Sequence, residues 1–215
     1  MTEIASDAAP VAVEKEALRR RLQTALRALA PSLVRTRSEA AAERLLAHRA
    51  IVGARTVALY ASIDRERELD PRLADPVLRA RGIRPVYPRV VSKKPPRLSF
   101  HAVSALTALV QGPLGVPQPS ADSPEVALQE IDAFVVPGIG FSASGARLGY
   151  GGGYYDATLA AAPRAIRLAY AHPEQLVSHL PESPRDQRVD EIIGPDRTLS
   201  CAPGRGAGFA SGDLP

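Results

Sequence analysis

Cysteine, tryptophan and long apolar segments are scarce or missing in this chain of 215 residues. Its one cysteine, Cys201, excludes a disulfide within the chain and a zinc site built from several cysteines. We therefore expect a protein of a reducing compartment and assign it to the cytoplasm. No apolar run approaches the roughly 20 residues of a membrane-spanning helix, so we expect no membrane partner. The first ten residues include Glu3 and Asp7 and lack the apolar core of a signal peptide.

The charge balance leaves two kinds of anionic partner open, and the scarcity of aromatic residues favours one of them. The formal net charge is +4 and the sequence pI is about 9.5, so a nucleotide or a nucleic acid could be attracted. Proteins that bind nucleic acid need clustered basic residues with interleaved aromatic side chains. Aromatic residues make up only 5% of this chain, which argues against a nucleic-acid partner.

Apolar patterning predicts alternating helices and strands in a single domain. Helices are predicted over 13–29, 71–81 and 156–161, and another is predicted to begin after Ser38 as its N-cap. In the helix over 71–81, the side chains expected to face inward are Leu73, Val77 and Leu78. Strands are predicted at 56–60, 83–86, 97–101, 131–136, 166–170 and 190–193. This order favours an α/β fold with a mostly parallel sheet flanked by helices, a Rossmann-like three-layer architecture. We expect a flexible N-terminus over 1–11, a folded domain over 12–194 and a flexible tail over 195–215.

A glycine-rich segment after the predicted strand 131–136 carries most of the chemistry. Residues 147–156 read Arg-Leu-Gly-Tyr-Gly-Gly-Gly-Tyr-Tyr-Asp and lie where α/β sheets bind their ligands, at the carboxyl end of a strand. The glycines allow backbone N–H groups to approach a phosphate, and Arg147 offers a planar cation. Asp156 is an oxygen ligand of the kind that Mg²⁺ prefers, or else a helix N-cap. The segment lacks the Gly-Lys-Ser/Thr ending of a Walker A loop, and a purely structural glycine turn is the alternative.

This segment resembles the signature of the 5-formyltetrahydrofolate cyclo-ligase family, also called methenyltetrahydrofolate synthetase. That signature runs Pro-Gly, an apolar pair, Phe, then Gly-x-Arg-Leu-Gly-x-Gly-Gly-Gly-Tyr-Tyr-Asp. The positions that match it are Pro137, Gly138, Phe141, Gly145, Arg147, Leu148, Gly149 and 151–156. Ser142 stands where the family usually has Asp.

Other parts of the chain extend the resemblance to residues 15–194. Lys15, Leu18 and Arg19 match the family's Lys-x-x-Leu-Arg helix. The stretch Glu68-Leu69-Asp70-Pro71 resembles its Glu-x-Asp-Thr element, whose Glu binds the folate, with Pro71 in place of Thr. Gln118 replaces the Glu of a Gly-x-x-Glu-Pro element. Near the end, Pro181, Asp186 and Asp190 resemble a Pro and two spaced Asp residues of the family.

The resemblance implies an ATP- and Mg²⁺-dependent ligase that converts 5-formyltetrahydrofolate to 5,10-methenyltetrahydrofolate through a phosphorylated formyl intermediate, with release of ADP and phosphate. It assigns catalysis to Arg147 and Lys15, and ATP binding to Lys15, Arg19, Arg147, Leu148, Gly149, Tyr150, Gly151, Gly152, Gly153, Tyr154 and Tyr155. It assigns the folate to Glu68, Tyr150, Gly151, Gly152, Gly153 and Tyr154, with Glu66 as the rival of Glu68. Asp156 and Asp190 are the expected metal ligands, with Asp190 preferred to Asp186.

The expected partners are therefore ATP and a reduced folate, bound by a monomer. The three departures, at Pro71, Gln118 and Ser142, keep an alternative open: a catalytically altered paralogue of the same fold that still binds nucleotide or folate. A lipase-like hydrolase is disfavoured because Ser142 lacks the second glycine of a nucleophile elbow. The four histidines lack metal-ligand spacing and are expected in loops or on the surface.

Overall fold

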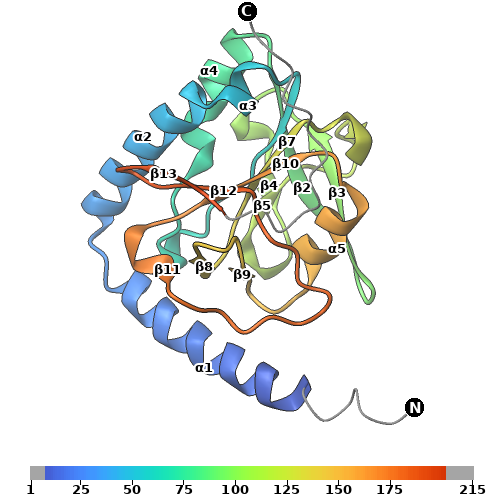
Figure 1. Ribbon diagram of the computed structural model, residues 1–215. Helices are drawn as coiled ribbons and strands as arrows, with labels where there is room; N and C mark the ends of the chain where they lie inside the picture. The colour runs from blue at the N-terminus through green and yellow to red at the C-terminus, as the bar shows by residue number, and fades with distance from the viewer. Residues whose placement is uncertain (1–7, 202–215) are drawn as a thin grey trace, which may run out of the picture.

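The structure, a computed structural model, describes residues 8–201 (Figure 1). Its helices are α1 (Ala8–Arg27), α2 (Pro31–Ala47), α3 (Arg49–Val52), α4 (Asp75–Ala80) and α5 (Tyr154–Ala161). Its strands are β1 (Thr56–Ala58), β2 (Arg84–Lys93), β3 (Pro96–Ala102), β4 (Val110–Gln111), β5 (Pro117–Gln118), β6 (Glu125–Val126), β7 (Ala133–Val136), β8 (Gly140–Ser142), β9 (Arg147–Leu148), β10 (Ile166–Tyr170), β11 (Leu176–Val177), β12 (Glu191–Ile193) and β13 (Thr198–Ser200). Short 3-10 helices connect them, among them η1 (Asp64–Glu66), η2 (Pro71–Ala74) and η6 (Pro173–Gln175).

The centre of the molecule is an eight-stranded sheet in the order β13-β12-β10-β7-β1-β2-β3-β6. The inner strands β12, β10, β7, β1 and β2 pair in parallel, whereas β13, β3 and β6 add antiparallel edges. Parallel strands place all their carboxyl ends at one edge of the sheet. This arrangement confirms the predicted α/β fold with a mostly parallel sheet.

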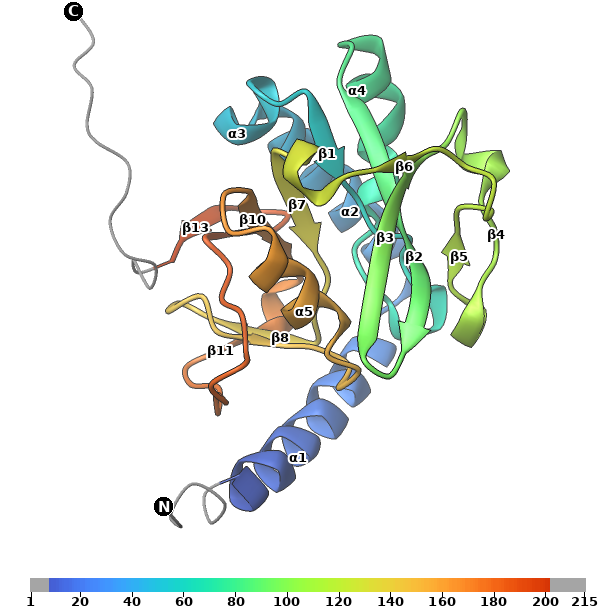
Figure 2. The same ribbon diagram turned by 90° about the vertical axis from the view of Figure 1, so that its right-hand side faces the viewer.

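Both faces of the sheet are buried, and the side-chain alternation of β7 shows how. Ala133 and Val135 belong to one apolar cluster, which contains α2 side chains, and Phe134 and Val136 belong to another, which contains Leu159 of α5. Successive side chains of a strand point to opposite faces, so one short apolar strand supplies both clusters. Figure 1 and Figure 2 show α2 and α4 on one side of the sheet and α5 on the other, which gives three layers.

Helix α1 lies apart from these layers and covers one end of the molecule (Figure 2). Its buried Leu22 packs with Ile139, Ala146 and Leu148, around the small sheet β11-β8-β9. Gly140 of β8 is needed for this approach, since a Cβ there would lie 2.6 Å from the Leu22 side chain. The helix is thereby held against the segment that leads into residues 147–156. No helix among residues 8–201 combines the length and the apolarity needed to cross a membrane.

Most predicted elements are present, and the differences have local causes. The first helix begins at Ala8, so residues 8–11 of the predicted flexible N-terminus form its first turn. The predicted flexible tail begins too early, because β13 lies within it and pairs with β12. Residues 1–7 and 202–215 lie outside the described residues. The N-cap prediction for Ser38 is wrong, because α2 begins at Pro31 and Ser38 bonds to the Val34 carbonyl inside it. Of the three side chains predicted to face inward from 71–81, Leu78 is buried as predicted. Leu73 and Val77 are 43% and 38% exposed, because a 3-10 turn precedes α4 and turns Ala74 inward instead.

Candidate active site

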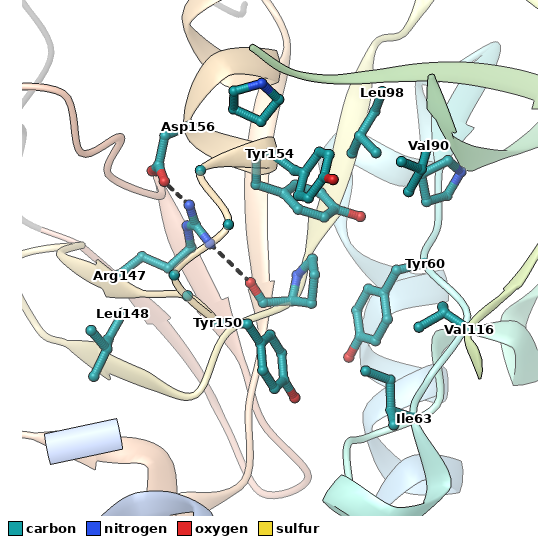
Figure 3. A pocket seen from close by; sticks show the side chains of 18 of the residues that line it. Tyr60, Ile63, Val90, Leu98, Val116, Arg147, Leu148, Tyr150, Tyr154 and Asp156 are labelled. Carbon is teal, nitrogen blue, oxygen red and sulfur yellow. Dashed lines mark hydrogen bonds and ion pairs between the residues drawn. The ribbon is translucent and has the colours of Figure 1, made fainter. Parts of the chain in front are cut away.

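A cavity of about 1010 Å³ lies beyond the carboxyl ends of β1 and β7, where the fold is expected to bind a ligand. One wall carries residues 147–156 and the charged side chains of α1. The opposite wall comes from the loop after β1, the β2–β3 hairpin and the 113–118 segment. Figure 3 shows Tyr150 and Tyr154 on the first wall facing Ile63, Val116, Val90 and Leu98 on the second. The volume lies at the upper end of the range for small-molecule binding sites.

The glycine-rich wall presents free backbone donors to the cavity. Gly151 and Gly153 have φ values of +92° and +70°, a left-handed conformation that favours glycine. Among residues 8–201, no acceptor is bonded to the backbone N–H of Gly151, Gly152 or Gly153. Gly153 is also the N-cap of α5, so a helix N-terminus begins here. Unsatisfied N–H groups at a helix N-terminus form an anion-binding site, which fits a phosphate.

Arg147 lies beneath this loop rather than in the open cavity. Its side chain is only 3% exposed. Its Nη2 donates to Asp156 Oδ1 at 2.7 Å, and its Nη1 donates to the Pro137 carbonyl at 3.3 Å (Figure 3). A Cβ at Gly149 would lie 2.8 Å from Nη1, so a larger residue there would push the guanidinium out of its present position. The contacts indicate that Arg147 orients Asp156 and supports the loop.

Two carboxylates, those of Asp156 and Asp186, line the charged end of the cavity. Asp156 Oδ1 accepts from the Gln187 backbone N–H at 3.1 Å, so Asp156 lies next to the segment that carries Asp186. Asp186 Oδ2 accepts from Lys15 Nζ and from the Ser183 N–H. Within residues 8–201, no hydrogen bond uses Asp156 Oδ2 or Asp186 Oδ1. One free oxygen on each of two neighbouring carboxylates fits Mg²⁺, which takes one or two carboxylates together with substrate phosphates.

The position of Asp190 corrects the expected metal pair. Asp190 does not line the cavity, and its Oδ2 accepts from the backbone N–H of Arg167 at 2.8 Å. Its own N–H donates to the Arg167 carbonyl, so this residue ties β10 to the segment before β12. The sequence pattern offered Asp186 and Asp190 as two similar candidates, and only the fold separates them. Nowhere in residues 8–201 do three His, Cys, Asp or Glu side chains form a metal-binding group.

Lys15 and Arg19 come from one face of α1, as the predicted helix requires, and both line the cavity. The Lys15 side chain is 11% exposed and contacts Asp186 and Ser183 Oγ. Arg19 Nε donates to the Gly149 carbonyl at 2.9 Å, and its guanidinium lies close to Gly151. Leu148 borders the cavity while its side chain packs into the α1 cluster. The first helix thus supplies both a cation and a support for the loop.

Glu66 and Glu68 both border the cavity, but their partners differ. Glu66 is held by Arg27 at 2.8 Å and by Arg65 at 3.3 Å. Glu68 is 6% exposed and has no basic partner within residues 8–201. Its Oε2 accepts from the Ile63 N–H and its Oε1 from the Tyr150 hydroxyl, each at 2.7 Å. Burial raises the pKa of Glu68 to about 7. Glu68 therefore remains the better candidate for a polar substrate group, because the charge of Glu66 is already neutralised.

Apart from Arg65, Glu66 and Glu68, the side chains of the opposite wall are uncharged and mostly apolar, and this surface was not anticipated from the sequence. Its uncharged residues come from segments distant in sequence: Tyr60, Ile63, Pro88, Val90, Pro95, Pro96, Leu98, Val116 and Pro117. Tyr154 and Tyr155 face the same space from α5, and the Tyr155 ring also stacks near Arg147, at 5.9 Å. Such a surface suits flat ring systems. The only sequence signal for this apolar surface is the alternation of apolar residues in the β2–β3 hairpin, and that pattern is common to strands in general.

The three departures from the family pattern have structural roles in this chain. Gln118 is buried, and its Oε1 accepts from the Val90 N–H at 3.2 Å, joining two parts of the apolar wall. Ser142 bonds to Ser144 at 2.8 Å in the turn between β8 and β9. Pro71 occupies the first position of η2, where a missing N–H costs nothing. None of these substitutions removes a group from the charged end of the cavity.

The histidines lie outside the cavity lining, in agreement with their lack of spacing. Two of them are more buried than expected. His101 lies in β3 between Ser99 and the Ser123 carbonyl, and His172 is fully buried against the Arg67 carbonyl at 2.9 Å. Burial lowers the pKa of His172 to about 4, so it is neutral at physiological pH.

Comparison with known proteins gives one consistent result. The model of the 5-formyltetrahydrofolate cyclo-ligase family matches residues 11–195. The chain is 32% identical over 174 residues to the 5-formyltetrahydrofolate cyclo-ligase of Escherichia coli K12, covering 80% of this chain and 94% of that one. The mouse enzyme of the same name is 27% identical over 196 residues, with 86% and 96% coverage.

Solved structures agree with this result. The 5,10-methenyltetrahydrofolate synthetase of Aquifex aeolicus superposes with a TM-score of 0.76 at 25% identity, covering 92% of this chain and 97% of that one. The synthetase of Mycoplasma pneumoniae superposes with a TM-score of 0.69, also at 25% identity, over 85% and 99%. With a family model that spans most of its length and a relative above 30% identity, this chain belongs to the 5-formyltetrahydrofolate cyclo-ligase family, a family of ligases.

Proposed function

We propose that this protein closes the ring of 5-formyltetrahydrofolate to give 5,10-methenyltetrahydrofolate, with conversion of ATP to ADP and phosphate. The observation that carries the proposal is a single cavity with free glycine N–H groups, a lysine and two carboxylates at one end and an apolar, aromatic wall at the other. The charged end fits a triphosphate with its metal ion, and the apolar end fits the rings of a folate.

The reaction we propose needs positioning more than a protein nucleophile. The formyl oxygen attacks the γ-phosphorus of ATP, and the bond to the β-γ bridging oxygen breaks to release ADP. The folate nitrogen N10 then attacks the formyl carbon, loses its proton, and phosphate leaves with the former formyl oxygen. Two reactants held in one cavity react as if intramolecular, and phosphoryl transfer is accelerated mainly by charge neutralisation.

Several residues would neutralise the phosphate charge. The N–H groups of Gly151, Gly152 and Gly153 and the N-terminus of α5 would bind phosphate oxygens, and Lys15 would add a cation from α1. Asp156 and Asp186 would hold Mg²⁺, which shields the phosphates when bound. Arg147 would act by orienting Asp156, and Glu68 would accept hydrogen bonds from the folate. A cytoplasmic monomer that binds only these small molecules is part of the same proposal.

A direct assay tests the function. The purified protein is incubated with 5-formyltetrahydrofolate and MgATP while the absorbance of methenyltetrahydrofolate is followed. We expect product that requires ATP and disappears when EDTA removes Mg²⁺, with activity restored by excess Mg²⁺. Absence of an ATP-dependent product, together with retained nucleotide or folate binding, would instead indicate a catalytically altered paralogue.

A further inference from the structure

One hydrogen bond joins the two halves of the cavity directly. The Tyr150 hydroxyl donates to Glu68 Oε1 at 2.7 Å, across 82 positions of sequence. Tyr150 lies between Gly149 and Gly151 in the loop proposed to bind phosphate. Glu68 follows β1 and η1 and is proposed to bind the folate. A residue of the nucleotide subsite therefore contacts the main polar group of the folate subsite.

The orientation of the Glu68 carboxylate depends on this bond. Its two oxygens have one partner each, the Ile63 backbone N–H and the Tyr150 hydroxyl. The first partner is part of the same short loop and moves with Glu68. The second is the one donor supplied by a different part of the chain among the described residues. Without the Tyr150 hydroxyl, the buried Glu68 carboxylate would accept only one hydrogen bond, and its orientation would be less well defined.

The position of Tyr150 depends in turn on the glycine loop. Its residue is 40% exposed, and Gly151 and Gly152 after it are also exposed. The loop is held near Tyr150 by the bond from Arg19 to the Gly149 carbonyl. Because the next three N–H groups are free, phosphate bound to them would add the restraints that the loop lacks.

We infer that Tyr150 is a positioning residue that couples the two substrates: nucleotide bound on the glycine loop fixes the Tyr150 hydroxyl, which orients Glu68 for the folate. This inference rests on the proposed function. Coupling between two binding sites is reciprocal, so the folate must strengthen nucleotide binding by the same factor.

The charges around Glu68 provide a second, independent readout. The titratable groups that face it are Tyr60 after β1, Glu66 and Asp70 in its own loop, Tyr150 in the glycine loop and Tyr155 in α5, while Arg27 of α1 faces Glu66 and Tyr150. Burial raises the pKa of Glu68, and the bond from Tyr150 opposes that rise. Loss of the Tyr150 hydroxyl should therefore raise the pKa of Glu68 further.

The test compares wild-type protein with Tyr150→Phe, which keeps the ring and removes the hydroxyl. Calorimetry measures the affinity for 5-formyltetrahydrofolate with and without a non-hydrolysable ATP analogue and Mg²⁺. We expect the nucleotide to tighten folate binding on the order of 10-fold in the wild type and less than about 2-fold in the variant. The acid limb of kcat/KM for the folate should also move to higher pH in the variant, with KM changing more than kcat.

Tyr170→Phe is the matched control, because it removes a buried hydroxyl that bonds to the Ser38 carbonyl outside the cavity. It should leave both the coupling and the pH profile as in the wild type. Wild-type coupling in Tyr150→Phe, or no coupling in an active wild-type protein, overturns the inference and leaves the proposed function standing. Absence of both turnover and folate binding in the wild type instead overturns the proposed function itself. If the Phe variant fails to fold, Tyr150→Leu replaces it: it also removes the hydroxyl, keeps Glu68 intact and should likewise abolish the coupling.

Discussion

The two walls of the cavity reach their rigidity by different means. On the charged wall, side chains are tied to one another: Arg147 to Asp156, Asp156 to the Gln187 backbone, and Lys15 to Asp186. On the apolar wall, the side chains of Val90, Leu98 and Val116 cannot form such bonds. Their position comes from the backbone of the hairpin and of the segment that carry them, which the bond from the Val90 N–H to Gln118 joins. Polar contacts are directional, whereas apolar packing tolerates small shifts.

This difference has a consequence for the effects of mutations. On the charged wall, removal of one group leaves its partners buried without a bond, so a single change should disturb several residues. On the apolar wall, removal of a methyl group should weaken one ligand and leave the rest of the site intact. Four experiments, from the largest expected effect to the smallest, test or refine this contrast.

Asp156→Asn and Asp186→Asn should each reduce turnover at least about 100-fold, because each removes a carboxylate proposed to hold Mg²⁺. Turnover at increasing Mg²⁺ concentration measures the effect, and the variants should need more Mg²⁺ for half-maximal activity. Asp190→Asn is the matched control, since Asp190 binds the Arg167 backbone outside the cavity. An equal loss of turnover in Asp190→Asn would restore Asp190 as a metal ligand.

Arg147→Met should reduce stability as well as turnover, because it leaves the partly buried Asp156 carboxylate without its ion pair. We expect a loss of about 3 kcal/mol in the free energy of unfolding, measured by urea denaturation. The double variant Arg147→Met/Asp156→Asn should recover part of that loss, as the uncompensated charge is gone. A single variant as stable as the wild type would mean that Arg147 is free to bind phosphate and is not tied to Asp156.

Glu68 should give the activity an acid limb near pH 7. Its pKa is raised to about 7, so the carboxylate is protonated below that pH and can no longer accept the hydrogen bonds that we assign to it. The same shift has a definite sign for stability: its contribution is fully present below the pKa of about 4.5 that Glu has when unfolded, and is lost as the pH rises toward 7.

Glu68→Gln checks both effects. It should have a low kcat/KM without an acid limb. Relative to the wild type, its free energy of unfolding should rise between pH 4.5 and pH 7, by up to about 3 kcal/mol. A wild-type profile that is flat through this pH range would show that Glu68 is ionised throughout.

Val116→Ala should have the smallest effect. Val116 faces the cavity opposite Tyr150 (Figure 3), and the shorter side chain removes apolar contact with the folate alone. We expect KM for the folate to rise about 3-fold, with KM for ATP and the thermal midpoint unchanged, as measured by initial rates and calorimetry. A rise in KM for ATP instead would assign the apolar wall to the adenine ring.

The sequence predicted the charged wall well because its information is local. The run from Arg147 to Asp156 is continuous, and Lys15 and Arg19 are one helical turn apart, so residue spacing alone places them together. The choice between Asp186 and Asp190 could not be made from the sequence, for a physical reason. Both follow a loop in similar surroundings, and which of them reaches Asp156 depends on how the segment from Pro181 onward crosses the site.

The apolar wall could not be predicted from the sequence for the opposite reason. Val90, Leu98 and Val116 are ordinary strand or loop residues, and nothing in their neighbourhoods distinguishes a ligand surface from a core. The parallel order of β7, β1 and β2 is a long-range property of the sheet, and it brings these segments opposite the glycine loop. The fold class could be predicted because the alternation of helices and strands is repeated along the chain. Where each element begins and ends depends on single contacts, such as the bond from Ser38 to the Val34 carbonyl, and these are not visible in the sequence.

The contact between Lys15 and Asp186 spans 171 positions, nearly the whole described chain. During synthesis the first helix leaves the ribosome long before the segment that carries Asp186. An unfinished chain therefore has the glycine loop without the lysine–aspartate contact that closes the charged end. Under the proposed function, ATP can be used only after the last segment has docked, so incomplete or truncated copies in the cell would not consume nucleotide.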